Sequence, residues 1–302
     1  MTTWIAAELM QAFEREETDA YRLCSAADGW VERFGSDVLV SSKTEEARTR
    51  LTTELLVWAL SANFKFTRIF GRHLPKQNAE REMPRLLLGD PESSLQTVAR
   101  ERMLRYGIDF ASGYSVGLFM DQRQNRTFVR ITRPKKMLNC FAYTCAFSVA
   151  AGSVRAETLS IDLSKKSLAR GRENFLLNSL PTAHHRFIAD DVMAVLPRLA
   201  RKGEKFDMII LDPPTFSRTH RGRAFQVERD FETLLMRALE VADRTARILL
   251  STNCTALNER ALEVMAKFCL KASRRAGSLH REPPLPDFPP GSAARTAWLT
   301  LR

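Results

Sequence analysis

The 302-residue chain lacks the features that mark several large classes of protein. It has no apolar run of the length that a bilayer-spanning helix needs. Its first residues carry acids instead of the basic start and small-residue cleavage site of a signal peptide. Its five cysteines form no CxxC pair and no cluster with histidine. These absences predict a cytoplasmic protein with reduced thiols, no membrane segment and no bound metal.

Phosphate-binding loops are missing as well. The sequence contains no Walker A pattern, and it has Tyr143-Thr144-Cys145-Ala146-Phe147 where a dinucleotide-binding protein carries G-x-G-x-x-G after its first strand. Such loops bring backbone amides and a helix terminus to a phosphate. Their absence argues against a P-loop nucleotidase and against a dinucleotide-dependent dehydrogenase.

Positive charge, by contrast, is abundant. The chain has 46 Lys and Arg against 35 Asp and Glu, a formal net charge of +11 and a pI near 9.8. This balance favours a polyanionic partner. Basic residues gather within 123–136 and again at Arg218, Arg221 and Arg223. We interpret the second cluster as a loop that grips phosphates, with a solvated surface loop as the alternative.

Two patterns divide the chain at about residue 120. Residues 1–120 mix helical stretches with short strands, which predicts a smaller N-terminal α+β domain. Within it, MLRYGIDFASGYSVGLFMD predicts a hairpin that turns at Ala111-Ser112-Gly113. In residues 121–302, strands and helices alternate, which predicts an α/β domain with a doubly wound, Rossmann-like parallel sheet. The 44% hydrophobic content supports a sizeable core.

Acidic residues follow three of the expected parallel strands. The strand in FDMIILDPPTF ends at Asp212, because two prolines cannot continue a sheet ladder. Asp162 ends the second strand, and Asp190 and Asp191 follow the third. Ligands bind beyond the carboxyl ends of such strands, where an acid after the second strand bonds ribose hydroxyls. S-adenosyl-L-methionine, which has a ribose and an adenine but no phosphate, fits this combination.

With these motifs the chain resembles the class I S-adenosylmethionine-dependent methyltransferases of the DPPxF type that modify 23S ribosomal RNA. The matching segments lie within about 97–302 and include MLNCFAYTCAFSVAA, TLSIDLSKKSLARGRENFLLN, HRFIADDV, FDMIILDPPTFSR, VERDFETLL and ILLSTNC. The family has Gly-Gly where this chain has Cys145-Ala146, so we expect the backbone to lie farther from the methionine part of the cofactor. No match is found to the N-terminal PUA domain of many members, so the resemblance assigns RNA capture to residues 21–120 and to basic loops.

The resemblance also implies roles for particular residues. Asp162 is expected to hold the ribose, and Asp191 the adenine edge. The implied cofactor-binding residues are Phe141, Ala142, Tyr143, Thr144, Asp162, Leu163, Asp190, Asp191, Asp212 and Pro213. The implied substrate-binding residues are Pro214, Phe216, Arg218, Arg221, Arg223 and Arg123. Phe216 would stack on a flipped base, with a place in the core as the alternative. The oligomeric state, monomer or homodimer, stays open.

Cys254 ends the fifth strand, within STNC. Cytosine C5 is a poor nucleophile, and a thiolate that adds at C6 makes C5 enamine-like, with Asp212 assisting at N3. Members of the family that make 5-methylcytosine carry a cysteine at this place, so the resemblance implies that Cys254 and Asp212 are catalytic. The alternatives are a buried, unreactive Cys254, a guanine-N7 or other base as the target, and a catalytically idle nucleic-acid-binding protein with the same fold.

Overall fold

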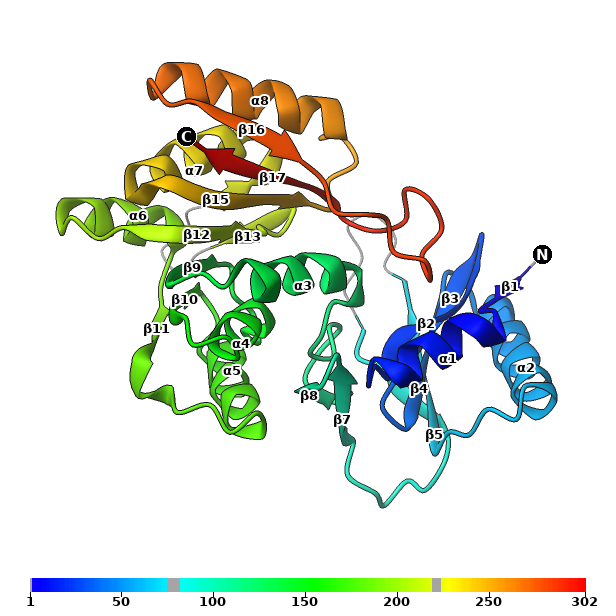
Figure 1. Ribbon diagram of the computed structural model, residues 1–302. Coiled ribbons are helices and arrows are strands. Elements are labelled where there is room, and N and C mark those ends of the chain that lie inside the picture. Colours follow the sequence, from blue (N-terminus) through cyan, green and yellow to red (C-terminus); the bar gives the residue numbers. More distant parts are fainter. Residues whose placement is uncertain (1, 75–81, 219–223) are drawn as a thin grey trace. The chain divides into compact units, whose positions relative to one another are not determined.

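The computed structural model describes residues 2–74, 82–218 and 224–302 of the chain. These residues form two compact units. The first contains Met1–Met120 and Leu285–Pro290, and the second contains Asp121–Pro284 and Gly291–Arg302. Figure 1 follows the chain through both units, from blue at the N-terminus to red at the C-terminus.

A six-stranded sheet ordered β1-β2-β3-β4-β5-β6 is the centre of the first unit. Neighbouring strands pair antiparallel, except that β4 and β5 pair parallel because the chain passes through α2 between them. The elements are β1 (Thr3–Trp4), α1 (Ala7–Arg15), β2 (Ala20–Ala26), β3 (Gly29–Phe34), β4 (Asp37–Ser42), α2 (Glu45–Ser61), β5 (Arg68–His73) and β6 (Arg85–Leu88). The side chains of Leu51 and Leu55 from α2 are fully buried in the core of this unit.

The segment Leu285–Pro290 joins the first unit through contacts with β2. The backbone N–H of Arg22 donates to Asp287 Oδ2 at 3.0 Å. The guanidinium carbon of Arg22 lies 4.0 Å from the centre of the Phe288 ring. A charge-assisted hydrogen bond and a cation–π contact therefore hold a distant part of the sequence on this sheet.

A separate hairpin of β7 (Gln96–Glu101) and β8 (Leu104–Asp109) corrects one prediction. The chain turns at Arg102 and Met103, both with positive φ of 48° and 73°. The turn predicted at Ala111-Ser112-Gly113 is therefore wrong, because those residues follow β8. Two-residue turns of this shape favour Asn and Gly. Because neither of these residues stands at 102 or 103, the sequence pattern did not predict this turn.

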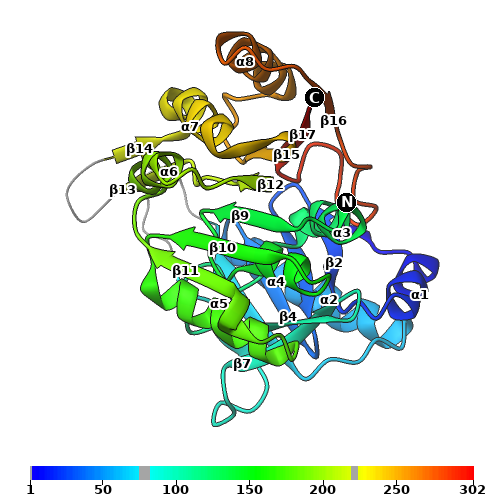
Figure 2. The same cartoon turned by 60° about the vertical axis from the view of Figure 1, so that its left-hand side comes forward.

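The second unit is built on a seven-stranded sheet ordered β11-β10-β9-β12-β15-β17-β16. Five strands pair parallel, whereas β17 pairs antiparallel with β15 and β16. Figure 2 shows β9, β10 and β11 side by side. The strands are β9 (Lys136–Cys140), β10 (Glu157–Asp162), β11 (His185–Ala189), β12 (Phe206–Leu211), β15 (Ala242–Thr252), β16 (Gly277–His280) and β17 (Arg295–Leu301), and a small hairpin adds β13 (Phe216–Arg218) and β14 (Ala224–Gln226).

Helices cover both faces of this sheet. In Figure 1, α3, α4 and α5 lie on one face and α6, α7 and α8 on the other. The helices are α3 (Arg123–Thr132), α4 (Ala146–Gly152), α5 (Lys165–Leu177), α6 (Val192–Arg201), α7 (Val227–Val241) and α8 (Glu259–Ala272), with 3-10 turns η1 (Met120–Gln122) and η2 (Thr182–His184). Coverage on both faces explains why the central strand β12 is almost continuously apolar. The parallel strands all end at one edge of the sheet, the carboxyl edge, and Phe141, Asp162, Asp190, Asp212 and Cys254 follow them there.

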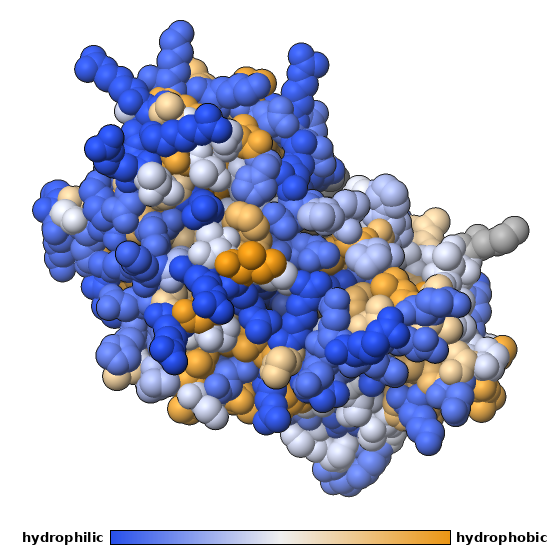
Figure 3. Space-filling model, in the orientation of Figure 1, coloured by the Kyte–Doolittle hydropathy of each residue, from blue (hydrophilic) through white to orange (hydrophobic). Residues whose placement is uncertain are grey.

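In the face drawn in Figure 3, hydrophilic residues dominate and apolar residues appear in small groups between them. Among the described helices, none combines the length and the apolar character that crossing a membrane requires.

Candidate active site

The loop after β9 has a strained backbone. Phe141, Tyr143 and Cys145 have φ values of 58°, 48° and 60°, although none of them is glycine. A left-handed conformation costs about 1–2 kcal/mol for a residue with a Cβ atom. Strain of this kind persists where surrounding contacts enforce it, and it is concentrated at ligand sites.

Asp162 and Asn174 enforce this conformation. Asp162 Oδ2 accepts the N–H of Tyr143 at 2.8 Å, and its Oδ1 accepts the N–H of Ser164 at 2.8 Å. Asn174 Nδ2 donates to the carbonyl of Thr144 at 2.9 Å. Burial raises the pKa of Asp162, although these amide hydrogen bonds act against the shift. Each carboxylate oxygen keeps a second lone pair, so Asp162 can still accept hydrogen bonds from ribose hydroxyls.

Gly171 of α5 makes room for the unusual Cys145. A Cβ atom at Gly171 would lie 2.4 Å from Cys145 Sγ, which is closer than real Cβ contacts. The two residues therefore fit together as a pair: the thiol takes the space that a glycine would leave at position 145. No local pattern in the sequence connects Gly171 with the loop after β9.

Asp190 and Asp191, at the end of β11, each have structural partners. Asp191 caps α6, because its Oδ1 accepts the N–H of Met193 at 2.9 Å. Asp190 pairs with Arg198 and accepts the N–H of Asp191 at 2.8 Å. Their predicted contact with adenine stays a prediction.

Asp212 lies in a hydrogen-bonded network beyond β12. Gln122 Nε2 reaches Asp212 Oδ2 at 3.4 Å and donates to Ser251 Oγ at 2.8 Å. Burial raises the pKa of Asp212 to about 6, and the charge of Asp121 adds to the shift, whereas the hydrogen bond with Ser251 and the charge of Arg126 lower it. At neutral pH a carboxyl with this pKa exchanges protons readily, as an acid or base in catalysis must.

Further residues hold Gln122 in place. Asn125 Nδ2 donates to Gln122 Oε1 at 2.8 Å, and Trp298 Nε1 donates to Asn125 Oδ1 at 2.9 Å. Gln122 was missed in the sequence, because only the fold brings the start of α3 next to the ends of β12 and β15.

Cys254 lies two residues beyond β15 and is 4% exposed. Its Sγ donates to Glu228 Oε1, in the first turn of α7, at 3.1 Å. Cys254 also belongs to the hydrophobic core of the unit. The sequence singled out Cys254 but not Glu228, because an acid in the first turn of a helix is common for reasons of helix stability alone.

The predicted substrate-binding residues differ in how exposed they are. Pro213 is buried and Pro214 exposed. Phe216, which is 51% exposed, has the Arg218 guanidinium 5.9 Å from its ring centre. Arg123 is a buried residue, so its contact with substrate stays a prediction without support from its position. Arg221 and Arg223 are not among the residues that the structure describes.

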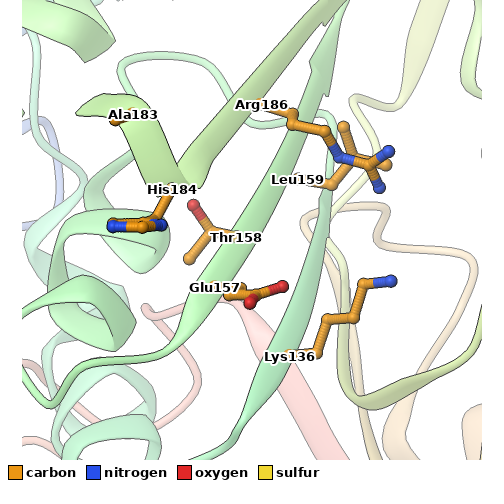
Figure 4. A pocket seen from close by; sticks show the side chains of 7 residues that line it. All are labelled: Lys136, Glu157, Thr158, Leu159, Ala183, His184 and Arg186. Carbon is orange, nitrogen blue, oxygen red and sulfur yellow. The ribbon is translucent and has the colours of Figure 1, made fainter.

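A hollow of about 200 Å³ lies at the other end of the parallel strands, the amino edge. Figure 4 shows the basic ends of Lys136 and Arg186 on one side of this hollow and His184 on the other. Glu204 pairs with both cations, at 3.0 Å from Lys136 and 2.6 Å from Arg186. Glu204 balances one of the two positive charges, and Glu157, which also lines the hollow, brings a second negative charge, so the hollow offers an anionic ligand little net positive charge.

No group of three or more His, Cys, Asp and Glu is arranged to bind a metal ion in the part of the chain that the structure describes. The groups found at the carboxyl edge are the acids Asp162, Asp190, Asp191 and Asp212, the thiol of Cys254 and the strained backbone after β9. These groups suit an uncharged ribose and adenine better than a phosphate, since no glycine-rich cradle of amides is present.

The chain belongs to the S-adenosylmethionine-dependent methyltransferase family, whose model matches residues 38–299. This membership confirms the predicted enzyme class and the predicted cofactor, S-adenosylmethionine.

Two relatives and one solved structure extend the comparison. The ribosomal RNA large subunit methyltransferase I of Aeromonas salmonicida is 30% identical over 293 residues, which are 93% of this chain and 72% of the relative. Its counterpart in Aeromonas hydrophila is 29% identical over the same shares. The structure of SMU.776, a candidate methyltransferase complexed with SAH, aligns with a TM-score of 0.82 at 25% identity and covers 97% of this chain and 78% of that chain. The Rossmann-like α/β fold is thereby confirmed.

Proposed function

We propose that this methyltransferase modifies ribosomal RNA at C5 of a cytosine. Support for the RNA class comes from the relatives, which are named for the large ribosomal subunit RNA. The net charge of +11 agrees with a polyanionic substrate.

The observation that carries the choice of cytosine C5 is the thiol of Cys254 at the carboxyl edge. Strands β12 and β15 are neighbours and pair Leu211 with Leu250, so Cys254 and Asp212 follow adjacent strands. A thiol is the nucleophile that C6 of cytosine requires, and Asp212, with a pKa of about 6, is suited to donate a proton to N3.

The cofactor would be held by the loop after β9 and by Asp162. When bound, S-adenosylmethionine supplies the methyl group. Asp162 would accept from the ribose while it keeps the left-handed conformation of Tyr143 through the backbone N–H. Asp190, Asp191 and Leu163 would border the adenosine part.

The substrate base would be received beside Pro214 and Phe216. A half-exposed aromatic ring next to an arginine suits stacking on a base and contact with its phosphate. The Arg218, Arg221 and Arg223 loop would grip the RNA backbone, and residues of the N-terminal region would add further contacts.

The test is methylation of large-subunit ribosomal RNA from cells that lack this gene. After reaction with the purified protein and S-adenosylmethionine, the RNA is digested and its nucleosides are separated by mass spectrometry. We expect one additional 5-methylcytidine. A gain of 7-methylguanosine would shift the target to guanine N7. Failure to bind S-adenosylmethionine would contradict any methyltransferase activity.

A further inference from the structure

The hydrogen bond between Cys254 and Glu228 joins two elements at the carboxyl edge. Cys254 Sγ is the donor and Glu228 Oε1 the acceptor, with 3.1 Å between them. The thiol is almost completely buried, whereas the residue that carries the carboxylate is exposed. A proton that reaches Glu228 therefore has a direct path to solvent.

The backbone on both sides of this pair is fixed. The N–H of Cys254 donates to Thr252 Oγ1 at 3.0 Å, and its carbonyl accepts from the N–H of Leu257 at 3.2 Å. On the other side, the N–H of Val227 donates to the carbonyl of Thr215 at 3.1 Å. The start of α7 is thereby tied to the loop that follows Asp212. The contact between thiol and carboxylate is thus set by the elements that form the site.

The neighbouring charges leave Glu228 available. Arg229 and Asp230, the next charged residues of α7, pair with one another at 2.8 Å. From β17, the Arg295 guanidinium reaches the carbonyl of Cys254 at 3.4 Å. Glu228 itself forms no ion pair among the described residues. A carboxylate in the first turn of a helix lies in the favourable field of the helix dipole.

We propose that Glu228 is the general base that takes the thiol proton of Cys254. This assignment rests on the proposed cytosine-C5 function. A thiol must lose its proton to attack C6, and a carboxylate at hydrogen-bond distance can take that proton. Cys254 Sγ already donates to Glu228 Oε1, so the proton acceptor is in place as sulfur attacks.

The step balances as follows. The S–H bond breaks and its proton passes to Glu228, the S–C6 bond forms, and the C5=C6 electron pair moves toward C5. C5 then takes the methyl group as the bond between that group and the sulfonium sulfur of S-adenosylmethionine breaks, and S-adenosylhomocysteine leaves. The C5 proton then leaves to water, the C5=C6 bond re-forms and the S–C6 bond breaks. The released thiolate regains its proton from Glu228, so both side chains return to their starting states.

A pH–rate profile of Glu228→Gln tests the assignment. General-base catalysis contributes about 10²–10⁴-fold, so we expect single-turnover methylation at pH 7 to fall by about 10²-fold or more. Because hydroxide then has to remove the thiol proton, whereas Asp212 acts in both proteins, the ratio of the variant's rate to the wild-type rate should rise about tenfold per pH unit from pH 7 to 9. The same ratio for the matched control Glu232→Gln, one turn along the same helix, should stay constant over this range.

A second measurement does not depend on methylation. Iodoacetamide reacts with thiolates, and peptide mass spectrometry separates Cys254 from the other cysteines. Glu228→Gln removes the negative charge beside Sγ, so Cys254 should be alkylated faster in the variant than in the wild type at the same pH. The same variant would thus be easier to alkylate and slower to methylate. The other four cysteines should react in the variant as they do in the wild type, which reports that the fold is intact.

The outcomes distinguish a failure of the general-base role of Glu228 from a failure of the proposed cytosine-C5 function. Normal methylation by Glu228→Gln, with Cys254→Ala inactive, overturns the base and leaves the cytosine-C5 function standing. A lower rate with an unchanged pH profile, or alkylation of all five cysteines, would mean that Glu228 only supports the structure, which also overturns the base. Normal methylation by Cys254→Ala would contradict both the general-base role of Glu228 and the cytosine-C5 function.

Discussion

The two edges of the parallel sheet hold their acidic side chains in opposite ways. At the amino edge, Arg186 and Lys136 lower the pKa of Glu204 to about 2. At the carboxyl edge, burial raises the pKa of Asp162 and raises that of Asp212 to about 6. Acids of the first kind stabilise the folded chain, whereas acids of the second kind are held at a cost to stability.

This difference separates structural from functional residues without any knowledge of the substrate. Perturbation by a partner of opposite charge is common on protein surfaces, but perturbation by burial needs a reason outside stability. In this chain the proposed ribose contact of Asp162 and the proposed catalytic role of Asp212 would provide that reason. Substitutions of comparable residues at the two edges test whether this difference holds.

The largest effect is expected for Cys254→Ala. If the thiol adds to C6, its loss should reduce methylation to background, because covalent activation acts on the transition state. Cofactor and RNA affinity should stay unchanged in calorimetry. RNA that contains 5-fluorocytosine should form a covalent adduct with the wild type and none with the variant.

The control for this substitution is Cys269→Ala. Cys269 is also buried, but it lies within α8, and its Sγ contacts the backbone carbonyl of Glu232 at 3.8 Å. It should keep methylation near the wild-type rate. Equal losses in Cys254→Ala and Cys269→Ala would attribute both to packing and would favour guanine N7 as the target.

The next largest effect concerns Asp162, whose matched partner at the amino edge is Asp207. Each carboxylate accepts two backbone N–H groups, from Tyr143 and Ser164 in one case and from Lys135 and Lys136 in the other. Both alanine variants should be less stable than the wild type. Only Asp162→Ala should weaken S-adenosylmethionine binding, by about 1.5–3 kcal/mol, the value of hydrogen bonds to a charged group. Equal affinities of the two variants in calorimetry would refute the ribose contact.

The sequence predicted the parallel sheet and the acids at its carboxyl edge, because both depend on local patterns. Alternating strands and helices fix the order of elements, and prolines mark the end of β12 beyond Asp212. The partners of these residues could not be predicted in the same way. Gln122 and Glu228 reach the site from other elements, and the Cys145–Gly171 fit depends on the packing of α5. The turn at Arg102 and Met103 was missed for a local reason, since neither residue is typical of a left-handed conformation.

A smaller effect, on the free energy of unfolding, is expected for Asp212→Asn. Because burial raises the pKa of Asp212, this substitution should stabilise the fold at neutral pH, whereas Glu204→Gln at the amino edge should destabilise it. A carboxyl whose pKa is raised from 3.8 to about 6 stabilises the fold below pH 4, and this contribution is lost as the pH rises through 6. Asparagine carries no charge to be desolvated. Above pH 7 the variant should therefore be more stable by about 1–2 kcal/mol, while methylation falls. Urea unfolding at pH 4.5 and pH 8 measures the difference, and a variant that is less stable at pH 8 would contradict it.

The smallest effect is expected at the amino edge, for Glu204→Gln. The lowered pKa of Glu204 means that its stabilisation is present above pH 4.5 and is lost as the pH falls toward about 2. Because Arg186 is 51% exposed in its side chain, solvent screens the pair, and we expect a loss of about 1 kcal/mol or less at pH 7. The gap in urea midpoint between wild type and variant should narrow between pH 5 and pH 3. It should also shrink in 1 M salt, and methylation should be unaffected. A gap that stays constant with pH would show that Glu204 acts through packing, and the contrast between the two edges would then rest on Asp162 and Asp212 alone.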